Sequence, residues 1–264
     1  MAREGRGPDF IEALSRGLDV LRAFDAERPV LSLSEVAQRA GLARPTARRI
    51  LLTLVELGYV RSADGGNSLT PRVLELGMAY VSSLGLWDLA RPHMKDLVAQ
   101  THESSSMSQL DGSDIVYMAR VAVPKLIALR VDIGTRFPAA RTSQGKVLLA
   151  WKDRDEVEAI LALPTRSGLP PEPAVADFEQ HLALVREQGY AYADEELAPG
   201  IRSVAVPVRD GDGVVRAAMN VTVHAAETSG DVVLGEHLPH LIEAGERVSR
   251  DWAAWQARPI VDMV

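Results

Sequence analysis

Residues 33–54 read LSEVAQRAGLARPTARRILLTL and contain two short helical patterns separated by a glycine. Ser32 and Glu35 have the S-x-x-E spacing of a capping box, which predicts a helix that begins just after Ser32. Gly41 is expected to end this helix at a sharp turn. Pro45 suits the first turn of a second helix, where its missing N–H is not needed. Two helices joined in this way predict a helix-turn-helix, which places its second helix in the DNA major groove.

The second predicted helix gathers basic side chains near its N-terminus. Helical spacing puts Ala47, Ile50, Leu51 and Leu54 on one buried face, and the residues at the start of the opposite face then point outward. Arginines at that position can meet phosphates or guanine edges. The predicted DNA contacts on this helix are Arg44, Pro45, Thr46, Arg48 and Arg49.

A hairpin is expected directly behind this helix. In YVRSADGGNSLT, at positions 59–70, the pattern predicts strands at 59–61 and 68–70 around a turn at 64–67. Such a hairpin forms the wing of a winged helix, and it adds Arg61 and Asn67 to the predicted DNA contacts. One alternative stays open: a helix-turn-helix can serve only protein contacts, with its arginines merely solvated.

Two further helices flank this module. In DFIEALSRGLDVLRAFD, from residue 9, Asp9 is a reasonable N-cap, and an apolar stripe follows at three- and four-residue spacing, formed by Ile11, Leu14, Leu18 and Leu21. After the wing, residues 72–86 form a linker helix whose stripe consists of Leu76, Tyr80 and Leu84. This stripe is either the seam of a dimer or a packing face for its own domain.

The remaining sequence alternates strands and helices. Strands are expected at 104–110, 114–121, 126–132, 190–196, 201–210 and 214–224. Helices are expected at 89–102, 143–152, 153–163, 177–189 and 231–256. This order predicts an α+β domain with a mostly antiparallel sheet. The predicted domains are therefore a winged helix-turn-helix at 8–71, the linker helix at 72–86 and a larger domain at 87–258.

Composition and charge restrict the function classes. The 264 residues carry a net charge of -7, yet residues 1–72 hold 11 Arg and no Lys against 9 acidic residues. This asymmetry suggests two modules with different partners. The sequence has no cysteine, which excludes disulfides and thiolate metal sites. No long apolar run predicts a membrane span, and MAREGRGPDF lacks the apolar core of a secretion signal, so we expect a cytoplasmic protein.

Three segments together resemble the IclR family of bacterial transcriptional regulators: the helix-turn-helix region from FIEALSRGLDVLRAFD to LVELGYV, then RTSQGKVLLA, then GYAYADEELAPGIRSVAVPV. The similarity spans almost the whole chain, in the family's order. It implies a winged helix-turn-helix, a linker helix and a C-terminal GAF-like domain that binds a small effector. It also implies a homodimer or dimer of dimers on a palindromic DNA operator. The N-terminal segment is similar to regulators of aromatic-acid catabolism, on the protocatechuate, 4-hydroxybenzoate and β-ketoadipate route.

The resemblance further implies an effector pocket between a curved sheet and the start of one helix. The matching positions are Thr142, Ser143 and Gly145 at the helix start, and Ser203, Asn220 and Thr222 on two late strands. A helix N-terminus favours anions, which suits an organic acid. Arg141 could supply the counter-charge. Some relatives carry an acid or a cysteine in this region, where the present chain has Ala193.

Enzymatic readings find weak support. Ser143 and Lys146 form the S-x-x-K pattern of penicillin-recognising serine hydrolases, but the companion S-D-N and K-T-G motifs are absent. His237 and His240 are spaced to share a metal, yet no third ligand is evident and a solvated face is expected. We expect no enzyme activity, no metal and no cofactor. The alternative is a serine hydrolase-like enzyme, or a sensor whose N-terminal module contacts only proteins.

Overall fold

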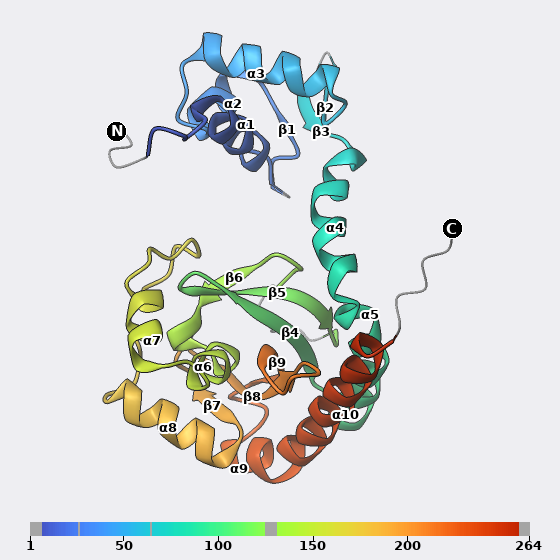
Figure 1. Ribbon diagram of the computed structural model, residues 1–264, viewed down its shortest axis with the longest axis vertical. Helices are drawn as coiled ribbons and strands as arrows, with labels where there is room; N and C mark the ends of the chain where they lie inside the picture. Colours follow the sequence, from blue (N-terminus) through green and yellow to red (C-terminus); the bar gives the residue numbers. More distant parts are fainter. Residues whose placement is uncertain (1–6, 26, 64, 125–130, 259–264) are drawn as a thin grey trace. The chain divides into compact units, whose positions relative to one another are not determined.

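The computed structural model describes residues 7–25, 27–63, 65–124 and 131–258, apart from the side chains of residues 81–84. The chain divides into two compact units, Met1–Ser83 and Leu84–Val264 (Figure 1). None of the helices in the described residues is long and apolar enough to cross a bilayer.

The first unit combines short helices with a small sheet. Its elements are α1 (Glu12–Arg22), β1 (Val30–Leu31), α2 (Leu33–Arg39), α3 (Arg44–Glu56), β2 (Val60–Ala63), β3 (Gly66–Leu69), a 3-10 turn (Pro71–Val73) and α4 (Leu74–Leu84). The sheet has the order β1-β3-β2 with antiparallel neighbours. A helix-turn-helix followed by a hairpin is thus present, as predicted.

The predicted capping box and glycine turn are confirmed. The Ser32 amide donates to Glu35 Oε2 at 2.8 Å, and the Glu35 amide donates to Ser32 Oγ at 3.3 Å. Gly41 then adopts a left-handed conformation with φ of 64°, which side chains disfavour. The Leu42 amide donates to the Ala37 carbonyl at 2.9 Å, and this bond closes the turn between α2 and α3.

The expectations for α1 need correction. The N-cap is Ile11, without a side-chain hydrogen bond, so the assignment of Asp9 as N-cap is wrong. Ile11 and Leu14 are 65% and 62% exposed. The residues of α1 and its C-terminal end that enter the core are instead Val20, Ala23 and Phe24, which pack with Leu31, Val36, Leu51, Leu54 and Val60. Of the predicted stripe, Leu18 is 41% exposed as well, and Leu21 alone packs against this core.

The turn of the wing is shorter than the predicted turn at 64–67. Gly66 and Asn67 pair with Ala63 and Ser62 inside the hairpin, so they belong to a strand and not to the turn. Asp64 lies outside the described residues. The sequence also gave no sign of β1, which pairs with β3. Gly66 allows this approach, because a Cβ atom there would lie 2.8 Å from the Leu31 carbonyl oxygen.

The second unit contains a six-stranded sheet with helices around it. Its elements are α5 (Leu86–Thr101), β4 (Ser104–Asp111), β5 (Asp114–Val121), β6 (Arg136–Pro138), a 3-10 turn (Ala139–Arg141), α6 (Ser143–Ala150), α7 (Arg154–Leu161), α8 (Phe178–Gln188), β7 (Ala191–Asp194), β8 (Ile201–Arg209), β9 (Val215–His224), α9 (Gly230–Val232), a π-turn (Val233–His237) and α10 (Leu238–Gln256). The strand order is β6-β5-β4-β9-β8-β7. All neighbouring strands are antiparallel, which confirms the predicted sheet.

Two details of this sheet differ from expectation. Of the strand predicted at 126–132, residues 126–130 lie outside the described part of the chain, and Val131 and Asp132 are not in a strand. The short strand β6 takes the edge position beside β5. Its three residues are too few to give an alternating pattern, and so it was missed.

Helices cover both faces of the sheet (Figure 1). On one face, Ala205 and Ala218 share a buried cluster with Val147 of α6. On the other face, Val206 meets α10, where a Cβ on Gly245 would lie 2.8 Å from Val206 Cγ2. Alternate residues of β8 thus point to α6 and to α10, as strand geometry requires.

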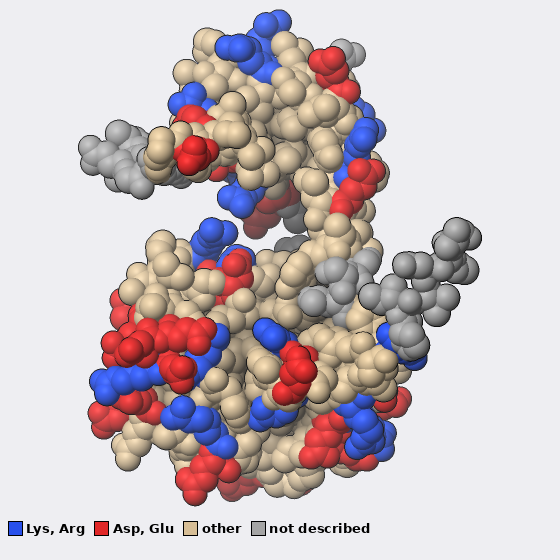
Figure 2. All heavy atoms as spheres, viewed as in Figure 1, with Lys and Arg blue, Asp and Glu red and all other residues tan. Residues whose placement is uncertain are grey.

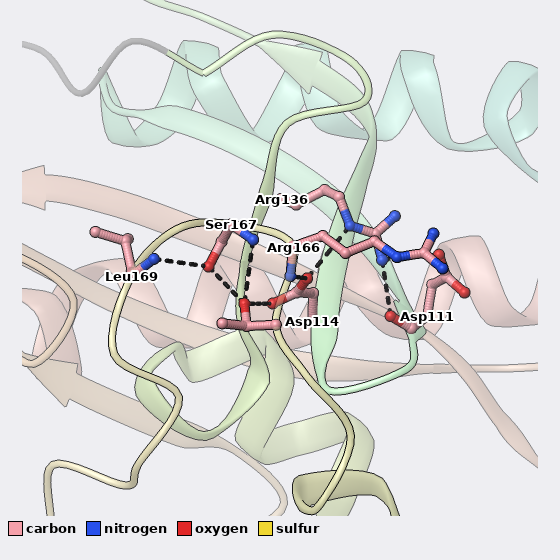
Figure 3. Close-up of polar contacts among 7 residues, drawn as sticks. Asp111, Asp114, Arg136, Arg166, Ser167 and Leu169 are labelled. Atoms are coloured by element: carbon pink, nitrogen blue, oxygen red, sulfur yellow. Dashed lines mark hydrogen bonds and ion pairs between the residues drawn. The ribbon is translucent and has the colours of Figure 1, made fainter. Parts of the chain in front are cut away.

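A buried carboxylate ties a long loop to the edge of this sheet (Figure 3). Asp114, only 1% exposed, stands at the turn between β4 and β5. Its Oδ2 accepts the Arg166 amide at 2.7 Å and Arg136 Nε at 3.3 Å, and the Thr165 hydroxyl donates to its Oδ1. Because three donors converge on one buried side chain, the segment between α7 and α8 is held close to the strands.

Candidate DNA-binding and effector sites

The start of α3 presents basic side chains to solvent. Arg44, Arg48 and Arg49 are exposed, whereas Ala47 on the other side of the helix is fully buried. No described residue forms an ion pair with these three arginines, so their charge is available to a polyanion. Figure 2 shows the basic side chains over α3. Pro45 is also exposed and Thr46 is half-buried.

The two predicted contacts in the wing behave differently. Arg61 is exposed on β2. Asn67, in contrast, uses its side chain inside the wing: Ser62 Oγ donates to its Oδ1 at 2.6 Å, and its Nδ2 donates to the Leu31 carbonyl at 3.2 Å. Arg61 is therefore accessible to solvent, whereas the Asn67 side chain joins β1 to the hairpin.

In the second unit, the strand register gathers small polar side chains on one face of the sheet. One cross-strand row runs from Arg120 on β5 through Ser106 on β4 to Asn220 on β9. The next row runs from Ser104 through Thr222 to Ser203. Directly opposite residues share a face, so these two rows form a polar floor.

The start of α6 covers this floor. Ser143 Oγ lies 2.8 Å from Ser203 Oγ, and Gln144 Nε2 donates to the carbonyls of Ser106 and Ala218 at 3.1 and 3.0 Å. Floor and cover enclose a cavity of about 40 Å³, lined by Glu103, Ser104, Tyr117, Arg120, Val131, Thr142, Ser143, Gln144, Ala193, Leu197, Ile201, Ser203, Asn220, Thr222, Val223 and His224. The cavity is polar and far smaller than a typical small-molecule site of about 300–1,000 Å³.

Five of the seven predicted effector residues line this cavity: Thr142, Ser143, Ser203, Asn220 and Thr222. Thr142, however, is the N-cap of α6, because its hydroxyl accepts the Gly145 amide at 3.0 Å. Capping by Thr142 leaves the Ser143 hydroxyl to face Ser203. The polar groups of the floor are linked in turn, since Asn220 Nδ2 donates to Thr222 Oγ1 at 2.9 Å.

The other two predicted residues do not line the cavity. Arg141 donates through Nη2 to the Glu196 carbonyl at 2.6 Å. Gly145 lets the backbone of α6 pass close to Ala139, because a Cβ there would lie 2.1 Å from the Ala139 carbonyl oxygen. Both residues therefore position the elements around the cavity, and neither side chain borders it.

The sequence reasoning missed several lining residues, of which three can carry charge: Glu103, Arg120 and His224. The Glu103 carboxylate is 6% exposed and accepts a hydrogen bond from Thr228 Oγ1 at 3.3 Å. Arg120 is half-buried, and burial lowers the pKa of its guanidinium. Burial also raises the pKa of the Tyr117 hydroxyl above the usual tyrosine range. The cavity wall is thus charged as well as polar.

A buried ion pair stands beside the cavity. Lys146 is fully buried and its ammonium contacts the Glu196 carboxylate. Burial lowers the pKa of Lys146, and Glu196 opposes that shift. Glu196 precedes Leu197, which lines the cavity, so this pair holds one wall in place. Lys146 is therefore occupied by Glu196 and not by Ser143.

The histidine pair of the last helical region is also resolved. His237 is 9% exposed in the π-turn and His240 is exposed, so the expectation of one solvated face is wrong for His237. Within the described ranges, no group of three or more His, Cys, Asp or Glu is arranged to hold a metal ion.

Comparison with protein families gives two matches. Residues 13–64 match the IclR helix-turn-helix domain, and residues 78–250 match the C-terminal domain of bacterial transcriptional regulators of the IclR type. The second match alone covers more than half of the chain.

Individual relatives agree with these matches. The Pca regulon regulatory protein of Pseudomonas putida is 38% identical over 244 residues, which cover 90% of this chain and 82% of that protein. The p-hydroxybenzoate hydroxylase transcriptional activator of Acinetobacter baylyi is 35% identical, with 91% of each chain covered. The crystal structure of an IclR homologue from Microbacterium hydrocarbonoxydans, complexed with 4-hydroxybenzoate, superposes with a TM-score of 0.80 at 26% identity and covers 92% of this chain and 100% of that one.

Proposed function

We propose that this chain, which belongs to the IclR family of bacterial transcriptional regulators, responds to an aromatic or keto acid bound in the second unit. The protein is a DNA-binding regulator controlled by a small effector. The observation that carries the proposal is the enclosed polar cavity between α6 and the sheet. Two similar proteins are named for the Pca regulon and for p-hydroxybenzoate hydroxylase, and this supports a role in aromatic-acid catabolism.

The proposed effector residues are those that line the cavity, namely Thr142, Ser143, Ser203, Asn220 and Thr222, with Arg141 and Gly145 supporting the helix start. The start of α6 carries the positive end of the helix dipole, which favours a carboxylate, although Thr142 already caps the Gly145 amide. The hydroxyls of Ser143 and Ser203 can donate to the same group.

The size of the cavity adds a requirement. An engineered cavity of about 150 Å³ holds benzene, whereas this cavity has about 40 Å³. A small keto acid such as pyruvate needs less extra space, whereas an aromatic acid or β-ketoadipate requires a wall to move. Residues 195–200 form the least regular wall, and Leu197 borders the cavity there. Since Glu196 is held by Lys146 and Arg141, we infer that an aromatic effector shifts the neighbouring Leu197 and not the whole segment.

The serine-hydrolase alternative has little geometric support. In an S-x-x-K enzyme the lysine must assist the serine, so their polar atoms must meet. Lys146 contacts Glu196, and Ser143 Oγ contacts Ser203 Oγ. We therefore propose that the protein has no enzyme activity. A regulator that binds bacterial chromosomal DNA would work in the cytoplasm.

For DNA recognition we propose a homodimer or dimer of dimers on a palindromic operator. One recognition helix makes few base contacts, and two helices related by a two-fold axis can read half-sites about 34 Å apart. The proposed contacts are Arg44, Pro45, Thr46, Arg48, Arg49 and Arg61, with Asn67 shaping the wing.

A thermal-shift screen tests the effector class. A ligand that binds the folded state raises the melting temperature by mass action. Hydroxybenzoates, protocatechuate, pyruvate and β-ketoadipate form the panel, with their amides or esters as neutral controls. We expect at least one acid to stabilise the protein more than its control does. If the acids and the neutral compounds are equally inert, the acid effector is wrong.

A further inference from the structure

The arginines on the sheet of the second unit differ in their partners. Arg136, Arg202 and Arg216 each contact a carboxylate, with Arg136 also held beside buried Asp114. Arg120 differs, because no described residue forms an ion pair with it. Its hydrogen bond runs from Nη1 to the neutral Ser106 Oγ at 3.1 Å.

The Arg120 guanidinium is also partly removed from water. It is half-buried, and desolvation lowers the pKa of its guanidinium, while Asp132 acts on it only from beyond ion-pair contact. Because an arginine stays charged in proteins, the result is a cation without a matched anion at the cavity wall. A bound anion would remove this imbalance.

The strand register aims Arg120 at the same space as the other polar groups. Arg120 stands opposite Ser106, and Ser106 stands opposite Asn220, so all three share one face of the sheet. All but Ser106 border the cavity directly, and Ser106 binds both Arg120 and the amide of Gln144 from α6. The guanidinium therefore lies on the same polar face of the sheet as Asn220, and it borders the cavity that Ser143 also lines.

We infer that Arg120 is the counter-charge that anchors the carboxylate of the effector, in place of Arg141. This inference rests on the proposed acid effector and assigns its main cation. Arg141 is a poor candidate because its Nη2 is committed to the Glu196 carbonyl and the residue does not border the cavity. A guanidinium also offers a planar pair of donors that matches a carboxylate.

The test compares acids with their neutral amides. The probes are 4-hydroxybenzoate against 4-hydroxybenzamide, and pyruvate against pyruvamide, titrated calorimetrically into the full-length protein. Arg120→Gln should weaken binding of the preferred acid by roughly ten- to hundredfold and change the affinity for its amide by less than about threefold. Arg120→Lys keeps the charge but loses the planar fork, so an intermediate loss is expected.

Two further variants serve as comparisons. Arg186→Gln removes an exposed arginine of α8 away from the cavity lining and should leave binding unchanged. Arg141→Gln should reduce acid and amide binding alike, because it loosens the wall without removing the anchor. Thermal melts of each variant identify any loss of folding. If Arg120→Gln does not fold, the acid affinity of Arg120→Lys is compared with that of the wild type instead.

The outcomes separate the anchor from the proposed function. Wild-type protein that binds acid, together with an Arg120→Gln variant that binds it equally well, would overturn the anchor and leave the acid effector standing. Loss of acid preference in Arg141→Gln alone would move the anchor to Arg141. Wild-type protein that binds neither acid nor any other acid of the panel would overturn the acid effector, and the anchor with it.

Discussion

Arg48 and Arg49 are adjacent on α3, both exposed and both without an ion-pair partner in the described structure. Their surroundings differ, because Arg49 also borders an apolar groove between α1 and α3. Substitution of either residue removes no core contact, so the stability of the fold should not change. Any effect on DNA affinity can therefore be read as a lost DNA contact.

For Arg49→Ala we expect a loss of roughly 1–3 kcal/mol on the operator and relaxed specificity at one position of each half-site. Arg48 stands at the edge of the same face, where a phosphate is the expected partner. Arg48→Ala should weaken binding to operator and random DNA alike and reduce the salt slope by about one unit. A salt series with both DNAs measures these effects. If Arg49→Ala instead changes the oligomeric state and leaves specificity intact, Arg49 acts in protein association through the apolar groove between α1 and α3, and not in base recognition.

Several residue-scale features followed from the sequence, and the reasons are local. A capping box and a glycine turn depend on a few neighbouring residues, so Ser32, Glu35 and Gly41 could be identified directly. The separate roles of Thr142 and Ser143 did not follow from the sequence: Thr142 caps α6, and the Ser143 hydroxyl faces Ser203. Arg141 was chosen for its proximity in sequence, although its guanidinium turns toward Glu196.

At the scale of elements, the strands and helices were predictable from their periodicity, but the cavity lining was not. The pairing of β4 with β5 shifts between Met107 and Ser108, so Tyr117 faces Ser108 while Ala119 faces Met107. This bulge adds one residue to β5. Tyr117 and Arg120 consequently both line the cavity although they are three apart, and a regular strand would place them on opposite faces.

The ion pair between α6 and the segment before β8 gives a prediction at the same scale. Lys146 is fully buried, and the Glu196 side chain is 12% exposed. Lys146→Met leaves the carboxylate without its partner and should lower the free energy of unfolding by about 3 kcal/mol. Adding Glu196→Gln should recover much of this loss, because the uncompensated charge is gone. Urea denaturation of the wild type, the single variant and the double variant measures these free energies of unfolding.

The same pair predicts the sign of a pH effect. Burial lowers the folded-state pKa of Lys146, so the unfolded chain binds more protons in the window between that value and the usual lysine pKa. The contribution of Lys146 to stability therefore rises as the pH increases through this window. Lys146→Met should remove that rise. Equal pH slopes for variant and wild type would show that the lysine is not desolvated.

For the whole molecule, the exposed apolar surface of α4 requires an explanation. Leu76 and Tyr80 are 54% and 50% exposed, while the side chain of Leu84 lies outside the described residues. Exposed apolar stripes of this kind mark association surfaces. The proposed dimer would bury this stripe against a second copy.

Light scattering on the purified protein should give the mass of a dimer or tetramer at micromolar concentration. Leu76→Glu and Tyr80→Glu should shift the protein toward the monomer, since a buried carboxylate opposes association. Met78→Glu is the matched control: Met78 is 52% exposed but points to the opposite side of the helix. A monomeric wild type, or equal effects of all three substitutions, would contradict this seam.

We propose that acid binding in the second unit controls DNA binding by the first. Fluorescence anisotropy on the gene's upstream region tests it, with 4-hydroxybenzoate or the strongest acid of the thermal screen. We expect the acid to change the operator affinity of the wild type by roughly five- to 150-fold. Ser143→Glu, which places a negative charge where the carboxylate would bind, should keep the operator affinity and lose the response. An unchanged acid titration in Ser143→Glu, or no operator binding by the wild type at low salt, would contradict the account.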